Sequence, residues 1–340
     1  MKKIQNYIHG RYQNSSDQEM EVYDPSIGEV ISKVVLSDKN DFNNTIASSK
    51  KSQLDWAKTT PLKRSRILSN YKNIIEKNID ELAQLVSKEH GKTLEDAKGS
   101  VTRGLEVVEF ACGIPHLLKG EFSQDVGTNI DSWSIRQPLG VCAGITPFNF
   151  PAMVPMWMFP IAIACGNSFI LKPSEKDPSC SLKLAEYFSV AGLPNGVFNV
   201  INGDKEIVNM LLDCNDISAI SFVGSTPVAK YIYEIASKNL KRVQALGGAK
   251  NHLVIMPDAN IDQAVDGIIG AAFGSAGERC MAVSVVVTVG NIADKLVEKI
   301  LAKSQKLRIA PWTDPDSDMG PLITKEHLEK VKKYIDIGVK

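Results

Sequence analysis

The 340-residue sequence lacks several features that mark particular classes of protein. It carries no net charge, since 39 basic and 39 acidic side chains cancel, which argues against a nucleic-acid groove or a membrane-surface patch as the main binding site. No apolar run reaches the roughly 18 residues of a membrane-spanning helix, and the longest candidate, residues 153–165, is interrupted by Pro155 and Pro160. We therefore expect neither nucleic acid nor a membrane as a partner.

Targeting signals and metal motifs are lacking too. No apolar stretch follows Lys2 and Lys3, and the segment is not an Arg-rich transit peptide, so a cytoplasmic location is expected. The six cysteines include no Cys-x-x-Cys pair, and none has zinc-ligand spacing with a histidine, so no metal site is predicted. Five of them lie in apolar or helical contexts and are expected to be small core residues in a reducing compartment. They are Cys112, Cys142, Cys165, Cys180 and Cys214.

The length and a hydrophobic content of 44% are sufficient for a large core and more than one domain. Short strands and turns are expected over residues 1–58. Apolar residues at three- and four-residue spacing then predict helices, and an alternating polar segment predicts an exposed hairpin. The helices are expected at 60–77, 79–90 and 94–112, and the hairpin at 120–138.

After Val141 short apolar runs alternate with helical stretches, which is typical of parallel strands joined by helices that cover both faces of a sheet. The expected strands are 141–145, 168–171, 197–201, 220–223 and 243–246. A second α/β segment begins near Asn251, with strands at 253–256 and 283–289 and a last helix from Lys325. The predicted fold class is α/β with a Rossmann-type parallel sheet.

Cys280 has the surroundings of a reactive thiol. It ends the run Gly274-Ser275-Ala276-Gly277-Glu278-Arg279-Cys280, in which small residues allow a substrate to approach closely. A cysteine nucleophile must be a thiolate, which a neighbouring cation such as Arg279 stabilises. A buried structural cysteine at the start of a strand is the alternative.

Three other segments carry polar groups directly after predicted strands. The Asn149 amide could donate to an oxyanion, although closing an Asx-turn is its simpler role. Lys172 could approach a phosphate and Glu175 a ribose, which would favour NAD over NADP, although the two could also be a solvated charge pair. The junction at Gly224 and Ser225 could receive a pyrophosphate. Ligands of doubly wound sheets bind at such strand ends, but the missing Gly-x-Gly-x-x-Gly fingerprint disfavours a classical Rossmann reductase.

Together these segments resemble the aldehyde dehydrogenase superfamily over essentially the whole chain. The matching segments, in the family's order and spacing, are Thr146–Pro151, Leu171–Glu175, Gly192–Val197, Phe222–Thr226, Gly247–Lys250 and Gly277–Cys280. The resemblance implies that Cys280 is the catalytic nucleophile and Asn149 the oxyanion donor, joined by the Cys280 backbone N–H. It also implies a set of NAD-binding residues, namely Thr146, Pro147, Phe148, Lys172, Glu175, Gly203, Gly224 and Ser225.

Leu246 departs from the hydrolytic members of the family, which carry a Glu at this position as the general base for water. An apolar side chain cannot activate water, so the thioacyl intermediate should wait for another acceptor. The runs Gly-Ala-Lys-Asn-His at 248–252 and Gly-Glu-Arg-Cys-Met-Ala at 277–282 resemble the CoA-acylating methylmalonate-semialdehyde dehydrogenases. That group converts methylmalonate or malonate semialdehyde to propionyl-CoA or acetyl-CoA, with loss of CO2 and reduction of NAD. The expected small-molecule partners are therefore the semialdehyde and CoA.

Two arginines suit a carboxylated substrate, because a guanidinium binds a carboxylate in a bidentate manner. The resemblance places Arg103 and Arg279 near the substrate carboxylate. A helix-surface salt bridge is the alternative for Arg103, and stabilisation of the thiolate alone is the alternative for Arg279.

The resemblance also implies a division of the chain. Residues 1–119 and 139–248 would form the NAD-binding domain, 120–138 an oligomerisation hairpin, and 249–340 the catalytic domain. Members of the family continue past Lys340 to a Glu that holds the nicotinamide ribose, so we expect a C-terminally truncated chain. We expect residues 1–340 alone to be inactive or poorly folded, and the full-length protein to be a homodimer or homotetramer. The alternatives are a hydrolytic aldehyde dehydrogenase and, of another class, an inactive fragment or scaffold protein.

Overall fold

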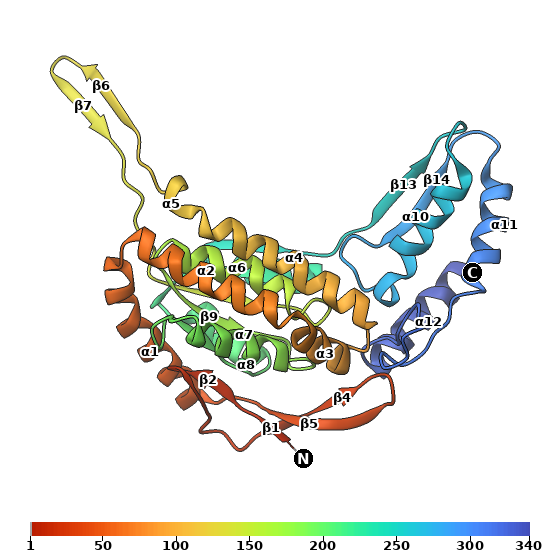
Figure 1. Ribbon diagram of the computed structural model, residues 1–340, viewed down its shortest axis with the longest axis horizontal. Coiled ribbons are helices and arrows are strands. Elements are labelled where there is room, and N and C mark those ends of the chain that lie inside the picture. The colour runs from red at the N-terminus through yellow and green to blue at the C-terminus, as the bar shows by residue number, and fades with distance from the viewer. Residues whose placement is uncertain (1) are drawn as a thin grey trace.

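A computed structural model describes residues 2–340 (Figure 1). Its central element is a seven-stranded sheet of order β12-β11-β8-β9-β10-β2-β3. The first five strands in that order are parallel, and β2 pairs antiparallel with β10 and with β3. Their bounds are β12 Arg242–Leu246, β11 Ile217–Val223, β8 Val141–Ile145, β9 Ser168–Lys172, β10 Phe198–Val200, β2 Asn6–Ile8 and β3 Arg11–Gln13. The predicted parallel sheet is confirmed, with an antiparallel pair added at one edge.

Helices cover both faces of this sheet, as the alternating pattern predicts. One face carries α2 (Pro61–Lys77), α3 (Ile79–His90), α4 (Leu94–Cys112), α6 (Met153–Ala164) and α7 (Ser179–Val190). The opposite face carries α8 (Lys205–Asp213) and α9 (Thr226–Lys238), together with the first turns of α1 (Lys39–Lys58). All five residues of β8 and of β9 are buried, so the sheet is the centre of the core.

The helix α1 corrects the expectation of only strands and turns before residue 58. Asp38 caps the helix, since its side chain accepts from the backbone N–H groups of Asn40 and Asp41. Its buried face includes Thr45 and Ser49 as well as apolar residues, so its apolar periodicity is weak and the sequence pattern conceals it. The strands before it, β1 (Lys2–Ile4), β4 (Glu19–Asp24) and β5 (Glu29–Val35), form a separate sheet of order β1-β5-β4.

A hairpin projects from the body of the molecule, as Figure 1 shows in yellow. Its strands are β6 (Phe122–Gly127) and β7 (Ile130–Trp133), within the expected range 120–138, and it follows the short helix α5 (Ile114–Leu117). Phe122 and Trp133 are a register pair, and their side chains are 64% and 68% exposed. The hairpin therefore presents aromatic surface to solvent.

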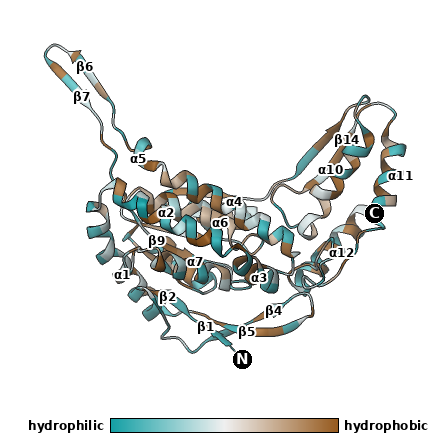
Figure 2. Cartoon of the chain, in the orientation of Figure 1, coloured by the Kyte–Doolittle hydropathy of each residue, from teal (hydrophilic) through white to brown (hydrophobic). Residues whose placement is uncertain are grey.

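The segment after residue 250 forms a second arm (Figure 1). Its parallel strands β13 (Asn251–Ile255) and β14 (Val283–Thr288) pack on α10 (Ile261–Phe273), and α11 (Ala293–Ser304) and α12 (Lys325–Val339) follow. Among its described residues five apolar side chains form a buried cluster and Ile323 is buried outside it, and α12 has no buried residue. Apolar residues, brown in Figure 2, consequently lie exposed on this arm and on the hairpin.

Two of the five cysteines expected in the core are buried. Cys142 and Cys180 are buried, three others are half-buried, and Cys280 is exposed. Among residues 2–340, no helix is long and apolar enough to cross a membrane.

Candidate active site

The turn that carries Cys280 has an unusual backbone. After α10 the chain passes through a short 3₁₀ element, η1 (Gly274–Gly277), in which Ser275 and Ala276 have φ values of +52° and +53°. Gly277 follows at +75°. Left-handed conformations cost a residue with a Cβ about 1–2 kcal/mol, so neighbouring contacts must hold this turn in place. Cys280 lies directly after the turn, before β14 begins.

A cavity of about 350 Å³ lies beside this turn and collects most of the predicted site residues. Its lining comes from the C-terminal ends of the central sheet and from the Cys280 turn, which are far apart in sequence. The predicted residues among its lining are Pro147, Phe148, Asn149, Gly224, Ser225, Arg279 and Cys280.

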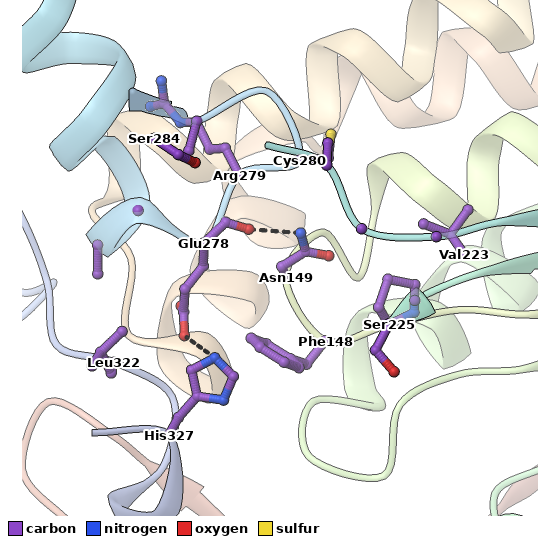
Figure 3. Close-up of a pocket in the computed structure, with 18 of the residues that line it drawn as sticks. Phe148, Asn149, Val223, Ser225, Glu278, Arg279, Cys280, Ser284, Leu322 and His327 are labelled. Carbon is purple, nitrogen blue, oxygen red and sulfur yellow. Dashed lines mark hydrogen bonds and ion pairs between the residues drawn. The ribbon is translucent and has the colours of Figure 1, made fainter. Parts of the chain in front are cut away.

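Asn149 is fixed by contacts on both its backbone and its side chain. Its Nδ2 donates to the Glu278 carbonyl at 2.7 Å (Figure 3), and its own carbonyl accepts from Lys92 Nζ at 2.7 Å. Because a carbonyl faces Nδ2, the orientation of the amide is determined. Nδ2 has a second N–H that this contact does not use, and the Cys280 thiol in Figure 3 points away from the amide.

Buried ionisable groups surround the side chain of Glu278. The carboxylate is 4% exposed and lies 3.4 Å from His90 Nε2 and 3.9 Å from His327 Nε2. Burial raises the pKa of Glu278 to about 7 and lowers the pKa of Lys92 to about 8. Burial, assisted by Lys92, holds the pKa of His90 well below its usual value. Sequence reasoning found none of these groups, because helix-end residues such as His90 and Lys92 carry no motif.

Lys172 and Glu175 are not among the residues that line this cavity and lie at and just after the C-terminal end of β9. Lys172 Nζ donates to Glu175 Oε2 at 2.9 Å, but Lys172 is buried, so the two are not the solvated charge pair that was the alternative to nucleotide binding. Burial opposes ionisation of Glu175, but Lys172 outweighs it and lowers the pKa of the carboxyl. Thr146 is nearby, since its N–H donates to the Lys172 carbonyl, and its buried Oγ1 has no hydrogen-bond partner among the described residues.

The N-terminus of α9 is arranged to receive an anion. Ser225 is its N-cap but makes no side-chain capping bond, so N–H groups of the first turn are available to a ligand. Gly224 precedes it, and a Cβ there would lie 2.4 Å from the Phe222 ring. Gly203 lies apart from this cavity, after β10, with φ +155°. The uncapped helix end, the unpartnered Thr146 hydroxyl and the Lys172–Glu175 pair together fit a dinucleotide.

The two arginines differ in their surroundings. Arg279 lines the cavity, but its guanidinium pairs with Asp96 on α4 and donates to the Gly270 carbonyl at 3.3 Å. Arg103 is exposed on α4 and follows Asp96 by about two helical turns, so it projects from the same face of the helix. Its expected alternative, a salt bridge, is not formed with any described residue. The structure thus brings Arg279 into the cavity, whereas Arg103 is not among the residues that line it.

Comparison with known proteins shows which family has a sequence like that of this chain. The profile of the Aldehyde dehydrogenase family matches residues 12–340. The chain is 53% identical to the malonate-semialdehyde dehydrogenase of Pseudomonas aeruginosa over 340 residues, which are 100% of this chain and 68% of that protein. It is 51% identical to malonate-semialdehyde dehydrogenase 3 of Geobacillus kaustophilus, covering 100% of this chain and 70% of that one.

Solved structures give the same result. A methylmalonate-semialdehyde dehydrogenase from Oceanimonas doudoroffii superposes with a TM-score of 0.97 at 52% identity, covering 99% of this chain and 69% of that one. A protein from Sinorhizobium meliloti in complex with NAD, provisionally assigned as a methylmalonate-semialdehyde dehydrogenase, superposes with a TM-score of 0.98 at 51% identity. The match covers 100% of this chain and 70% of that one.

Proposed function

The chain belongs to the aldehyde dehydrogenase family, and from this premise we propose that it catalyses NAD-dependent, CoA-acylating oxidation of malonate or methylmalonate semialdehyde. The products would be acetyl-CoA or propionyl-CoA and CO2. The observation that carries the proposal is that Cys280, Asn149 and the uncapped N-terminus of α9 meet in one cavity. The names of relatives at 51–53% identity support the choice of substrate.

Cys280 is the proposed nucleophile. Its thiolate adds to the aldehyde carbon, and the carbonyl oxygen becomes an oxyanion. The unused N–H of Asn149 and the Cys280 backbone N–H, which donates to no described residue, would stabilise that oxyanion. Because the thiol in Figure 3 points away from Asn149, this step requires Cys280 to change its χ1 rotamer.

NAD, when bound, supplies the hydride acceptor. The adenine ribose would lie at Lys172 and Glu175, and the diphosphate at Gly224 and Ser225. Thr146 Oγ1, which is buried without a partner, would gain a hydrogen bond from the bound cofactor. Loss of hydride from the tetrahedral carbon leaves a thioester on Cys280.

The fate of that thioester distinguishes acylating from hydrolytic chemistry. The thioester carbonyl is an electron sink β to the substrate carboxylate, so the bond to CO2 breaks and its electron pair forms an enolate that is then protonated. CoA, as a thiolate, attacks the remaining acyl group and releases the Cys280 thiolate. Leu246 ends β12, and an apolar side chain there provides no base to activate water.

The remaining assignments are proposals about recognition and assembly. Arg279 and Arg103 would bind the substrate carboxylate, Arg279 through the N–H groups that Asp96 and Gly270 leave unused. Residues 1–119 and 139–248 would be the NAD-binding domain and 249–340 the catalytic domain. The hairpin at 120–138 would pair subunits in a homodimer or homotetramer, because exposed aromatic side chains such as Phe122 and Trp133 mark protein interfaces.

The test is NADH formation with malonate semialdehyde, with and without CoA, for the wild-type protein expressed from its uninterrupted reading frame and for two cysteine variants of it. Cys280→Ala should abolish NADH formation. Cys214→Ala removes a half-buried thiol outside the cavity and should retain it. Wild-type turnover that is indifferent to CoA would reject the acylating proposal and favour the hydrolytic alternative.

A further inference from the structure

The left-handed turn before Cys280 needs an external constraint. Ser275 and Ala276 both have a Cβ, yet both adopt positive φ. Such conformations persist only where surrounding contacts over-determine them, and they concentrate at functional sites. Within the turn, Glu278 N–H donates to the Ser275 carbonyl at 3.0 Å, which closes the turn but does not select its handedness.

The constraint comes from Asp96, which contacts both ends of the turn. Its Oδ2 accepts from the Ser275 backbone N–H at 3.0 Å, and its Oδ1 accepts from the Arg279 guanidinium. Gly274 makes the second contact possible, because a Cβ at that position would lie 2.6 Å from Arg279 Cζ. One carboxylate thus joins the start of the turn to the residue before Cys280.

Asp96 is itself held by the N-terminus of α4. The N-cap Thr93 accepts from the Asp96 N–H at 3.3 Å, and a helix N-terminus favours a negative charge in its first turn. The adjacent Ala97, Ser100 and Val101 are buried against the core. The carboxylate therefore lies on a helix that packs on the central sheet, while its partners Ser275 and Arg279 belong to the segment after residue 250.

We propose that Asp96 is a positioning residue for the catalytic turn. Through Ser275 it holds the left-handed backbone that presents Cys280, and through Arg279 it orients the guanidinium that faces the substrate carboxylate. The proposal rests on the proposed function only in taking Cys280 as the nucleophile and Arg279 as the carboxylate ligand. It assigns to Asp96 no contact with the reacting atoms.

Three variants separate the two contacts. Asp96→Ala removes both, while Asp96→Asn keeps an oxygen for the Ser275 N–H and loses the charge that holds Arg279. Glu95→Gln is the matched control, because Glu95 lies in the same turn of α4, is also acidic, and has a side chain that is 87% exposed. The readouts are hydrogen exchange of the Ser275 amide, kcat, and the KM values for NAD, malonate semialdehyde and an uncharged aldehyde such as propionaldehyde.

Asp96→Ala should speed exchange of the Ser275 amide and lower kcat, each by about ten- to hundredfold, the range of a lost charge-assisted hydrogen bond. The KM for NAD should not change. Asp96→Asn should keep slow exchange and raise the KM for malonate semialdehyde but not for propionaldehyde. Glu95→Gln should match the wild type in every readout.

Wild-type kcat in Asp96→Ala would overturn the proposal, whether or not exchange is faster, because the contact would then be structural only. An equal rise in both aldehyde KM values in Asp96→Asn would overturn the role assigned through Arg279. If the wild-type protein shows no CoA-dependent turnover, the proposed function fails. The exchange rate of the Ser275 amide still decides whether Asp96 holds the turn.

Discussion

The two regions of the molecule, residues 2–248 and 251–340, are held together by different forces. In the first region, β8 and β9 are buried along their whole length and helices cover both faces of the sheet. In the second region, β13 and β14 are mostly half-exposed, and six apolar side chains, a cluster of five and Ile323, are buried among the described residues. Packing dominates in the first region and contributes little in the second.

This difference in packing explains how Cys280, in the second region, is held next to the proposed cofactor-binding residues of the first region. The second region meets the first through polar contacts near Cys280, chiefly Asp96 with Arg279 and Ser275, and Asn149 with Glu278. Packing contacts of Phe148 with the His327 ring and of Gly91 with Pro321 add to them. Trp312 adds a hydrogen bond from Nε1 to Asp24 at 3.0 Å. The site geometry therefore depends on polar groups between the regions, whereas the cofactor-binding surface depends on packing.

The difference in packing between the two regions can be tested most directly by replacing one leucine with alanine in each region. Leu68→Ala on α2 removes a side chain that is 0% exposed and should lower the free energy of unfolding by about 2–5 kcal/mol. Leu328→Ala on α12 removes one that is 40% exposed and should cost under about 1 kcal/mol. Urea unfolding measures both, and equal losses would show that the second region is packed as tightly as the first.

The second prediction concerns pH and the buried carboxyl of Glu278. Its pKa is raised from 4.5 to about 7 in the folded protein, so the folded protein binds the proton more tightly than the unfolded chain does. Stability therefore falls as pH rises from 4.5 to 7 and then levels off. This contribution is on the order of 3 kcal/mol, a net value in which the charges of Lys92 and Lys176 already offset part of the effect of burial.

Glu278→Gln should remove this contribution and flatten the pH dependence of urea unfolding between those limits. Glu329→Gln changes a carboxylate that is 58% exposed and serves as the control. An unchanged slope in Glu278→Gln would show that the carboxyl titrates in the folded protein as it does in water.

The third prediction concerns Leu246, in the first region, and the proposal that its apolar side chain leaves no base to activate water. Leu246→Glu places a carboxylate at the end of β12 and should raise CoA-independent release of the free acid about tenfold, at the low end of what general bases contribute. Free acid and acyl-CoA can be separated and quantified by mass spectrometry. Leu246→Gln adds a polar group without a base and should leave the product ratio unchanged; an increase equal to that of Leu246→Glu would contradict the assignment.

The fourth prediction has the smallest expected effect and concerns the left-handed backbone of the turn before Cys280. Ala276→Gly relieves a left-handed residue and should stabilise the protein by about 0.5–1 kcal/mol, after the entropy cost of glycine is subtracted. Ala272→Gly, in the last turns of α10, should destabilise it by a similar amount. Thermal unfolding compares the two, and destabilisation by Ala276→Gly would show that the turn is not left-handed in solution.

Much of the first region could be predicted because its signals are local. The predicted runs 141–145 and 168–171 are largely apolar and bounded by turn residues, so the strands β8 and β9 follow from the sequence to within one residue. α1 was missed because small polar residues form part of its buried face. The helices at 61–77, 79–90 and 94–112 matched their expected ranges closely, since each has a clear apolar stripe.

The site could be predicted only in part. Cys280 and Asn149 were found by their motifs, and the structure places both at one cavity. Asp96, Lys92 and His90 were not found, because what matters about them is a contact with a segment about 180 residues away, as in the Asp96–Ser275 bond. Such contacts depend on how the regions dock, which no local pattern encodes.

The most direct test of the account is to look for the acyl group on Cys280. The protein would be mixed with NAD and malonate semialdehyde without CoA, quenched in acid, digested, and the peptide containing Cys280 analysed by mass spectrometry. We predict an acyl adduct on Cys280 that persists without CoA and is discharged as acyl-CoA when CoA is added. NADH formation without any adduct on Cys280, or an adduct lost equally fast without CoA, would contradict thioester transfer to CoA at this residue.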